Sequence, residues 1–508
     1  MPKISYWIFL IGYLLLAWIY QYPRIMFELP QSLHQWRQAD CLSLASNYQG
    51  GNDFFEPSVN YLGRDGTGKT MSEFPVIYYA VGKIWRDTGE QICIYRGLIA
   101  FIFFWGLLAV MRMVEEQLKN SWYAIFTALL MFTSPVLVYY SNNFLMNIPA
   151  FSFALIGLFF FFRYLKSPVA INFIFCCIFY TLAALLKASS LLSFIAVVLL
   201  LVLSHLRNNP LKINNVPLRR KAYLAIIGVF LIPLIWYRYA IWYNAQHTGG
   251  IFLIGTLPIW KMTSAQIQET LRHLFVQHLR WDYFRPFTEV AFLLFAIAIV
   301  PMWRAIERNL LILLVLISMG SVAFCLLFFG ALQWHDYYVI DLFILVPILL
   351  MAFGSGLNHY FPRILSSVIG VVLMLGFLVH NADFARRRNL ERYDINNYRN
   401  LHHRDIFQAF SEIEPLLKEL HIGPEEKVIS LSDYSINITL VLMHRKGWTD
   451  YGIGQNPDRI NERIEQGARY LFVADKKTLE NPVLAPYLKN KIGEYRNIMI
   501  YDLTGIIH

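Results

Sequence analysis

Long apolar segments recur along the first 380 residues of this 508-residue chain, and they constrain its fold more than any other feature. About 20 apolar residues in a helix cross the roughly 30 Å hydrocarbon layer of a bilayer. Charged residues make up only 15% of the chain, whereas roughly 25% is usual in soluble domains, so a water-soluble fold is not expected. The sequence predicts a mainly α-helical, polytopic membrane bundle of about eleven spans, near residues 4–22, 92–111, 122–140, 148–165, 171–187, 188–206, 222–243, 288–303, 310–330, 338–357 and 363–380.

Basic residues indicate which helix ends face the cytoplasm. With the N-terminus inside, the inner segments carry many cations, namely Lys3, Arg112, Lys119, Arg163, Lys166, Arg207, Lys212, Arg219, Arg220, Lys221, Arg304, Arg308 and Arg363. The outer segments carry few, as the positive-inside rule expects. Arg386, Arg387 and Arg388 on the predicted outer side do not fit this rule, although long domains cross the membrane largely regardless of charge. The net charge of +10 indicates contact with lipid headgroups or phosphate rather than with nucleic acid.

Residues 1–380 are expected to form the membrane domain and residues 381–508 an extracytoplasmic α/β domain. Two outer segments are large, 23–91 and 244–287, and helical pieces lying on the membrane are expected in both. In the C-terminal domain we expect a helix near 404–420 and strands near 427–431, 469–474 and 497–503. The five cysteines are scattered and predict neither a disulfide framework nor a metal site.

A polar and aromatic cluster directly follows the first span, at Ser32-Leu33-His34-Gln35-Trp36-Arg37-Gln38-Ala39-Asp40. If helical, it places Arg37 and Asp40 on one face, with His34 one turn before Arg37. A carboxylate and a guanidinium at a membrane surface suit transfer of a phosphate-linked sugar, because Asp40 can take a proton from the acceptor hydroxyl while Arg37 holds the phosphate. A simple intrahelical ion pair, with His34 capping or stacking, explains the same residues equally well.

Two further motifs lie in the same outer segment. Glu73 precedes a helix expected to start at Pro75, where it has either a capping or a chemical role. Residues 63–70 fit the phosphate-loop pattern G-x-x-x-x-G-K-[ST], but they do not lie between a strand and a helix, so a flexible glycine-rich loop is expected instead of a nucleotide site. Lys69 of this loop remains a candidate for contact with a lipid phosphate.

These residues resemble the GT-C superfamily of membrane glycosyltransferases, in particular the bacterial branch similar to protein mannosyltransferases and the lipid A aminoarabinose transferase. The resemblance covers most of residues 1–380, and its most specific feature is Asp40, at the place of the family's catalytic carboxylate. Glu73-Phe74-Pro75 resembles a second motif of the first outer loop, in which relatives often have Lys-Pro-Pro with a phosphate-gripping lysine. Because Glu73 cannot bind phosphate in that way, the task is expected to fall to Arg37, Lys69, Arg96 or another cation.

Two more features carry the resemblance. Lys187, after Leu185 and Leu186, resembles the family's lysine next to the active site, although a lysine at a helix end also reaches headgroups without any catalytic role. The segment 334–338, with His335 and Tyr337, resembles a His/Tyr-rich stretch near the donor phosphate, and an interfacial aromatic belt is the structural alternative. Asp341 and Arg238, inside predicted spans, favour a hydrated cleft.

The resemblance implies an integral membrane glycosyltransferase of the bacterial inner membrane, acting on the extracytoplasmic side. It implies a polyprenyl-phosphate-linked sugar as donor and inversion at the anomeric carbon, with Asp40 as catalytic base. Donor contacts are then expected from His34, Arg37, Lys69, Glu73, Arg96, Lys187, His335 and Tyr337. The acceptor is a lipid, a glycan or a protein, and no cofactor, metal or nucleic-acid partner is expected. A transporter or flippase for lipid-linked glycans is the alternative from another class, and a non-enzymatic assembly scaffold is a weaker one.

Overall fold

The computed structural model describes residues 4–206, 220–247 and 255–506. The chain divides into two compact units, of which unit 1 comprises Met1–Met26, Arg96–Tyr237 and Gly255–Leu390. Unit 2 comprises Phe27–Tyr95, Arg238–Ile254 and Glu391–His508. Four of the cations assigned above to inner segments, Lys3, Arg207, Lys212 and Arg219, lie outside the described residues, as does the part of the second outer segment at 248–254.

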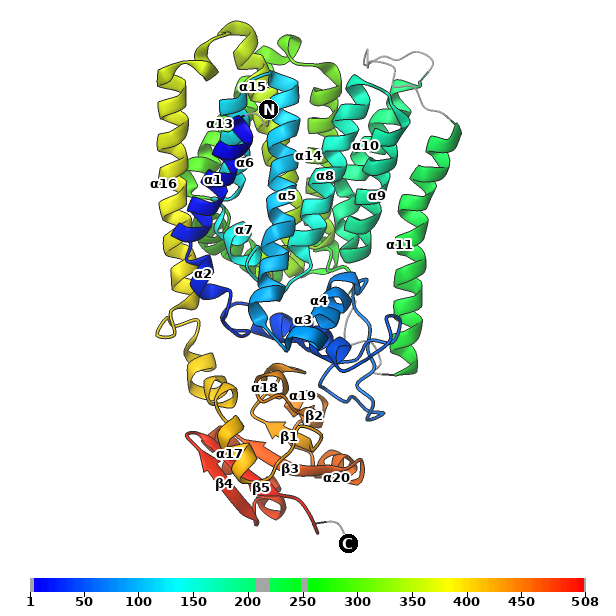
Figure 1. The fold of residues 1–508 in the computed structure, drawn as a ribbon, viewed down its shortest axis with the longest axis vertical. Coiled ribbons are helices and arrows are strands. Elements are labelled where there is room, and N and C mark those ends of the chain that lie inside the picture. The colour runs from blue at the N-terminus through cyan, green and yellow to red at the C-terminus, as the bar shows by residue number, and fades with distance from the viewer. Residues whose placement is uncertain (1–3, 207–219, 248–254, 507–508) are drawn as a thin grey trace. The chain divides into compact units, whose positions relative to one another are not determined.

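Apolar helices make up unit 1 (Figure 1). Among the described residues, seven helical segments are long and apolar enough to span a membrane: Ile92–Leu118 (α5), Asn147–Lys166 (α8), Ala222–Gln246 within α11 (Arg220–Gln246), Pro286–Ala305 including α13 (Pro286–Met302), Arg308–Leu327 (α14), Asp336–Tyr360 including α15 (Leu345–Tyr360), and Val368–Tyr393 (α16). Four shorter apolar helices accompany them: Ile4–Ile19 (α1), Ser121–Met131 (α6), Ala170–Leu186 (α9) and Ala188–Ser204 including α10 (Leu191–Ser204). Each coincides with one predicted span, and the predicted polytopic bundle is confirmed.

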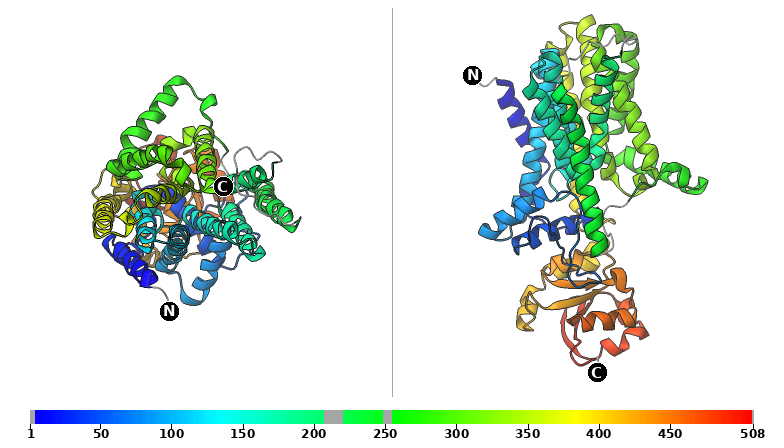
Figure 2. Two further views of the ribbon diagram at one scale, coloured as in Figure 1. Left: turned by 90° about the horizontal axis from the view of Figure 1, so that it is seen from above. Right: turned by 90° about the vertical axis from the view of Figure 1, so that its right-hand side faces the viewer.

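Small residues let the helices of unit 1 approach one another closely. A Cβ at Gly157 of α8 would lie 2.8 Å from the ring of Tyr180 on α9, so only glycine fits there. Close contact through small residues is a general feature of helix packing in membranes. The view from above in Figure 2 looks down these helices. Outward-facing leucine, isoleucine, valine and phenylalanine side chains are exposed on α11, α13, α14 and α16, as expected for helices that face lipid.

The helical segments between the spans follow their sequence signals. A break at Phe132–Ser134 divides the predicted span 122–140 into α6 and α7 (Pro135–Tyr140), and Pro135 opens the second piece. The second outer segment contains α12 (Ser264–His273), which begins with a capping box formed by Thr263 and Gln266 and continues as a π-helix to Asp282. The helix expected there is therefore present.

Unit 2 contains a five-stranded sheet with the order β2-β1-β3-β5-β4. Its strands are β1 (Lys427–Leu431), β2 (Lys446–Thr449), β3 (Ala468–Val473), β4 (Lys491–Tyr495) and β5 (Ile498–Asp502). The first three are parallel, and β5 and β4 join in antiparallel orientation. The crossovers include α18 (Ile438–Leu442), α19 (Asp450–Ile453) and α20 (Pro457–Glu465), as parallel strands require. Strands β2 and β4 were not predicted, and the predicted helix 404–420 is broken, with its last piece, α17 (Glu414–Glu419), starting beside Pro415.

The first outer segment belongs to unit 2 and pairs with its sheet. Backbone hydrogen bonds join Leu62 N to Gly447 O (2.8 Å) and Gly447 N to Asn60 O (3.0 Å), so this segment extends the sheet beyond β2. Two helices of the segment, α3 (Gln35–Gln49) and α4 (Val76–Thr88), pack against each other. Gly82 makes this possible, because a Cβ there would lie 2.6 Å from Cβ of Tyr48.

Candidate active site

Local contacts fix the start of α3, the helix that carries Asp40. His34 precedes the helix in the left-handed conformation (φ 55°), and its side chain does not cap the helix. The side chain of Gln38 turns back and donates to the carbonyls of Gln31 (2.7 Å) and Leu33 (2.8 Å). These bonds hold the preceding turn against the helix and so fix the start of the helix that carries Arg37 and Asp40. The predicted helix through Arg37 and Asp40 is therefore present.

The side chains of Arg37, Asp40 and Glu73 lie together. The Arg37 Nη1 atom is 4.0 Å from Asp40 Oδ2, and the Arg37 Nη2 atom bonds the carboxylate of Glu73. The second oxygen of Glu73 accepts a hydrogen bond from the hydroxyl of Tyr78 (3.2 Å). Asp40 is buried, and the other two side chains are each 21% exposed, so one guanidinium serves two carboxylates at the edge of the protein interior. The intrahelical pair that the sequence allowed is present, but its guanidinium is shared with Glu73.

An amide from the C-terminal part of the chain completes this cluster. Asn437 Nδ2 donates a hydrogen bond to Asp40 Oδ1 (2.9 Å), and both side chains are buried. Sequence reasoning did not find Asn437. Nothing in the local pattern around residue 437 connects it with residue 40, because the contact depends on the pairing of the first outer segment with the sheet.

Burial and charge set the proton affinity of this cluster. Burial raises the pKa of Asp40 to about 7, although Arg37 and the hydrogen bond from Asn437 act in the opposite direction. The carboxylates of Glu73 and Asp433 contribute to the increase. Burial also favours a higher pKa for Glu73, but the Arg37 guanidinium outweighs it and holds the pKa of Glu73 below its ordinary value. Asp40 can therefore take up and release a proton near neutral pH, while Glu73 stays ionised.

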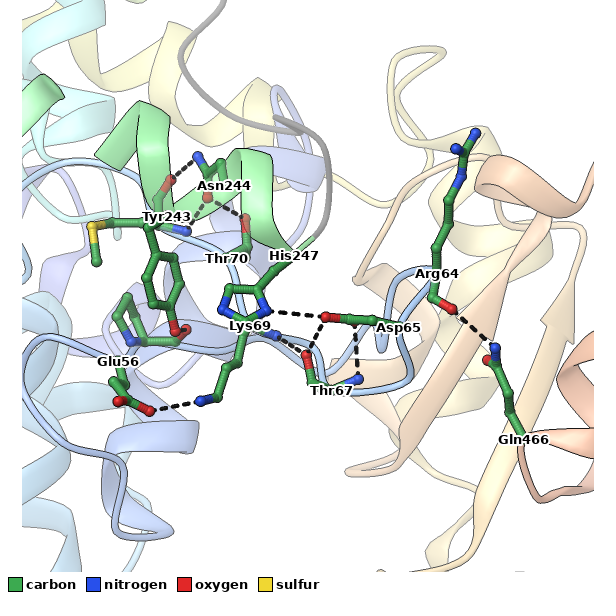
Figure 3. A network of polar contacts seen from close by, with 12 residues as sticks. Glu56, Arg64, Asp65, Thr67, Lys69, Thr70, Tyr243, Asn244, His247 and Gln466 are labelled. Carbon is green, nitrogen blue, oxygen red and sulfur yellow. Dashed lines mark hydrogen bonds and ion pairs between the residues drawn. The ribbon is translucent and has the colours of Figure 1, made fainter. Parts of the chain in front are cut away.

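Lys69 lies in the glycine-rich loop 63–70 and pairs with Glu56 (2.7 Å), as Figure 3 shows. Within the loop, the Asp65 carboxylate accepts hydrogen bonds from the backbone and hydroxyl of Thr67, and His247 contacts the same carboxylate (3.1 Å). The loop closes a hairpin-like turn, because Lys69 bridges back to Ser58. A strand–loop–helix arrangement is absent from these described residues, in agreement with the interpretation that the phosphate-loop pattern here is not a nucleotide site.

Unit 1 contains a second polar cluster, around Asp341. Lys187 Nζ lies 3.2 Å from Asp341 Oδ2, and the hydroxyls of Ser189 (2.5 Å) and Ser190 (2.7 Å) donate to the same carboxylate. Asp341 is 4% exposed, so these contacts offset the free energy that burial of its charge in a membrane helix costs. Lys187 also lies over the ring of Tyr338, 5.6 Å from its centroid. Arg238, which the sequence also places inside a predicted span, belongs to unit 2 and is exposed.

The other predicted residues of unit 1 have aromatic surroundings. The ring of His335 stacks on Tyr338, with centroids 5.3 Å apart, and contacts Tyr337 at the same distance. Asp336 accepts a hydrogen bond from the hydroxyl of Tyr140 (2.6 Å). Arg96 is fully buried, where its guanidinium donates to the carbonyl of Asn142 and lies over the ring of Phe144.

The structure thus brings Arg37, Asp40 and Glu73 together in unit 2 and pairs Lys187 with Asp341 in unit 1. Lys69 has Glu56 as its ion-pair partner. Within the described ranges, no group of three or more His, Cys, Asp or Glu side chains could hold a metal ion. The expected independence from metals and cofactors stays a prediction.

No protein-family model matches the sequence, and no curated protein matches it. Solved structures do match. ArnT from Cupriavidus metallidurans in the apo state is 11% identical, with a TM-score of 0.59, and the match covers 97% of each chain. The same protein bound to undecaprenyl phosphate gives the same identity and TM-score over 100% of this chain and 99% of that chain.

The chain has a GT-C fold. The arabinofuranosyltransferase AftD from mycobacteria also matches, at 11% identity and a TM-score of 0.50, over 97% of this chain and 40% of AftD. The resemblance first noted at Asp40 and the loop after it is therefore confirmed for the fold. In combination with the apolar helices, the GT-C fold makes this chain a multi-pass membrane protein.

Proposed function

We propose that this protein is an integral membrane glycosyltransferase that moves a sugar from a polyprenyl-phosphate donor to a lipid, glycan or protein acceptor. One observation carries the proposal: the carboxylate of Asp40 is buried beside the cationic side chain of Arg37, and this burial raises its pKa to about 7. A general base works best when its pKa lies near the operating pH, and a nearby cation stabilises a phosphate that gains charge.

The structural comparisons support the donor class. The matching ArnT structure contains undecaprenyl phosphate, and its fold covers the whole of this chain. A donor of that kind keeps its lipid in the membrane and presents its phosphate at the surface, so a membrane bundle with a charged cluster outside the spans suits it.

In the reaction, the acceptor hydroxyl oxygen attacks the anomeric carbon and forms the new glycosidic bond. The bond from that carbon to the phosphate oxygen breaks, and its electron pair leaves with the polyprenyl phosphate. The proton of the acceptor hydroxyl passes to the Asp40 carboxylate and then to solvent. A single displacement of this type inverts the anomeric configuration.

Arg37 has two roles in this proposal. Its guanidinium faces Asp40 and binds Glu73, and it is the cation of this cluster that we assign to a phosphate oxygen of the donor. Glu73 limits the net charge and orients the guanidinium, in place of the phosphate-gripping lysine of the related motif. Donor contacts from His34, Lys69, Arg96, Lys187, His335 and Tyr337 stay predictions. We place the reaction on the extracytoplasmic side of a bacterial inner membrane, with the N-terminus in the cytoplasm.

The test is transfer by the reconstituted full-length protein. Proteoliposomes receive a panel of undecaprenyl-phosphate monosaccharides labelled in the sugar, with membrane extract as the source of acceptors. We expect label in a product other than the donor, and we expect Asp40→Asn to reduce this transfer at least roughly 100-fold, the usual contribution of a general base. Asp53→Asn, an exposed aspartate in the same outer segment, is the matched control. Normal turnover by Asp40→Asn would remove Asp40 from the mechanism.

A transporter or flippase for lipid-linked glycans is the second candidate, because it also needs an apolar bundle with polar clusters. The same proteoliposomes distinguish the two. A transferase forms a new glycosidic bond and releases undecaprenyl phosphate, whereas a flippase moves intact labelled donor between leaflets and is insensitive to Asp40→Asn.

A further inference from the structure

The side chain of Asn437 is directed at Asp40 by its other contacts. Asn437 Oδ1 accepts a hydrogen bond from the backbone N–H of Tyr61 (3.0 Å) and a longer one from the hydroxyl of Ser43 (3.5 Å). A backbone N–H can only donate, so the amide oxygen must be on the Tyr61 side. The amide nitrogen then points to Asp40 Oδ1, at 2.9 Å.

Asn437 does not serve the helix that it precedes. It is the N-cap residue of α18, a position where asparagine usually accepts a hydrogen bond from the following backbone, but it forms no such bond. Other side chains supply the acceptors. Ser435 Oγ accepts a hydrogen bond from the backbone N–H of Ile438 (2.9 Å), and Asp433 Oδ2 accepts one from the backbone N–H of Thr439 (2.8 Å). The amide of Asn437 is therefore available for Asp40.

We propose that Asn437 is a positioning residue, through which the C-terminal part of the chain fixes one oxygen of Asp40 and leaves the other to receive the acceptor proton. This inference rests on the proposed function. An amide N–H is neutral and only donates, so it orients the carboxylate without taking its proton. The second oxygen of Asp40, Oδ2, lies 4.0 Å from Arg37 Nη1.

The contact also favours the ionised form of Asp40. Arg37 on α3 and Asn437 before α18 lower its pKa, whereas burial, Glu73 before α4 and Asp433 after β1 raise it. A charge-assisted hydrogen bond corresponds to roughly one to two pKa units. Loss of the Asn437 donor should therefore move the titration of Asp40 upward, whereas loss of a merely structural contact should not.

Two substitutions separate these roles. Asn437→Asp keeps an acceptor for the N–H of Tyr61 but loses the donor to Asp40 and brings a second carboxylate next to it. Asn437→Ala loses both. The matched control is Asn60→Ala. Asn60 is a buried asparagine of the same network that bonds Ser43 (2.8 Å) and the carbonyl of Arg445 (3.0 Å), and within the described part of the chain its side chain does not bond Asp40.

The experiment measures the protonated carboxyl band of Asp40 by infrared spectroscopy of the full-length protein, as the difference between each protein and its Asp40→Asn counterpart across pH. We expect a midpoint near 7 in the wild type, an increase of roughly one to two units in Asn437→Ala, and a larger one in Asn437→Asp. Asn60→Ala should titrate like the wild type. In the transfer assay, the acid limb of kcat should move upward by the same amounts, with KM for the donor unchanged.

An unchanged midpoint in folded Asn437→Asp would overturn the inference, as would an equal shift in Asn60→Ala. The infrared titration does not depend on any substrate. Absence of transfer by the wild type would therefore refute the proposed function, and transfer that survives Asp40→Asn would refute the role of Asp40 as base. An inactive Asp40→Asn together with unshifted Asn437 variants would refute only the positioning role.

Discussion

At the residue scale, the guanidinium of Arg37 interacts with two carboxylates, those of Asp40 and Glu73. Glu73→Gln removes a negative charge that raises the pKa of Asp40 and releases Arg37 from its strongest partner. Both effects favour ionised Asp40, so the acid limb of the pH–rate profile should move to lower pH, opposite in direction to the Asn437 variants. The profile of transfer between pH 5 and 9 measures this, and an upward movement would contradict the assigned charges.

The raised pKa of Asp40 also has a consequence for stability. Between the ordinary pKa of 3.8 and the folded value of about 7, the folded protein holds a proton that the unfolded chain has released. The stability of unit 2 should therefore decrease as pH rises through this window, by about 4 kcal/mol at most. Asp40→Asn removes the ionisation, so its apparent Tm relative to the wild type should be higher at pH 8 than at pH 5. A difference in Tm that does not change with pH would show that burial does not raise this pKa.

At the scale of elements, the spans were predictable and the partners of the outer segment were not. An apolar run of about 20 residues is a local property, so all eleven predicted spans have their counterpart in an apolar helix. Strand β1 was predictable for the same reason, because Val428, Ile429 and Leu431 form a short apolar segment, and all three are buried. The hydrogen bond between Asp40 and Asn437 was not predictable, because it depends on the pairing of the first outer segment with strand β2. Short strands with mixed patterns, such as β4, carry too weak a signal.

The ion pair between α9 and the segment before α15 gives a prediction at this scale. Lys187 is 17% exposed and Asp341 is 2% exposed at the side chain, so Lys187→Met leaves a buried carboxylate without its cation. Such a loss costs about 3–5 kcal/mol. The double variant Lys187→Met with Asp341→Asn should regain most of the lost thermal stability.

The transfer activity of the double variant then separates two roles of Lys187. If Lys187 only neutralises Asp341, activity returns together with stability. If Lys187 binds donor phosphate, as the resemblance implies, stability returns and activity does not. Equal stability of the single and double variants would show that the pair does not form in the membrane.

At the scale of the whole molecule, the proposed reaction requires unit 2 to face the extracytoplasmic side, because Asp40 and the C-terminal residues belong to the same unit. The distribution of cations predicts this orientation, and Arg386, Arg387 and Arg388 are the exception. Positive charges orient a membrane protein mainly through short loops, so these three arginines should not determine the topology. Their replacement by glutamine should leave the orientation unchanged.

Cysteine labelling in spheroplasts tests this orientation. The five native cysteines are buried or half-buried, so a membrane-impermeant maleimide should label exposed introduced cysteines preferentially. Glu425→Cys, exposed in unit 2, should react in intact spheroplasts, and Ser167→Cys, exposed between α8 and α9, should react only after lysis. The reverse pattern would place Asp40 in the cytoplasm, where soluble nucleotide sugars are the common donors. The orientation would then no longer support a lipid-linked donor, even if Asp40 proved to be essential.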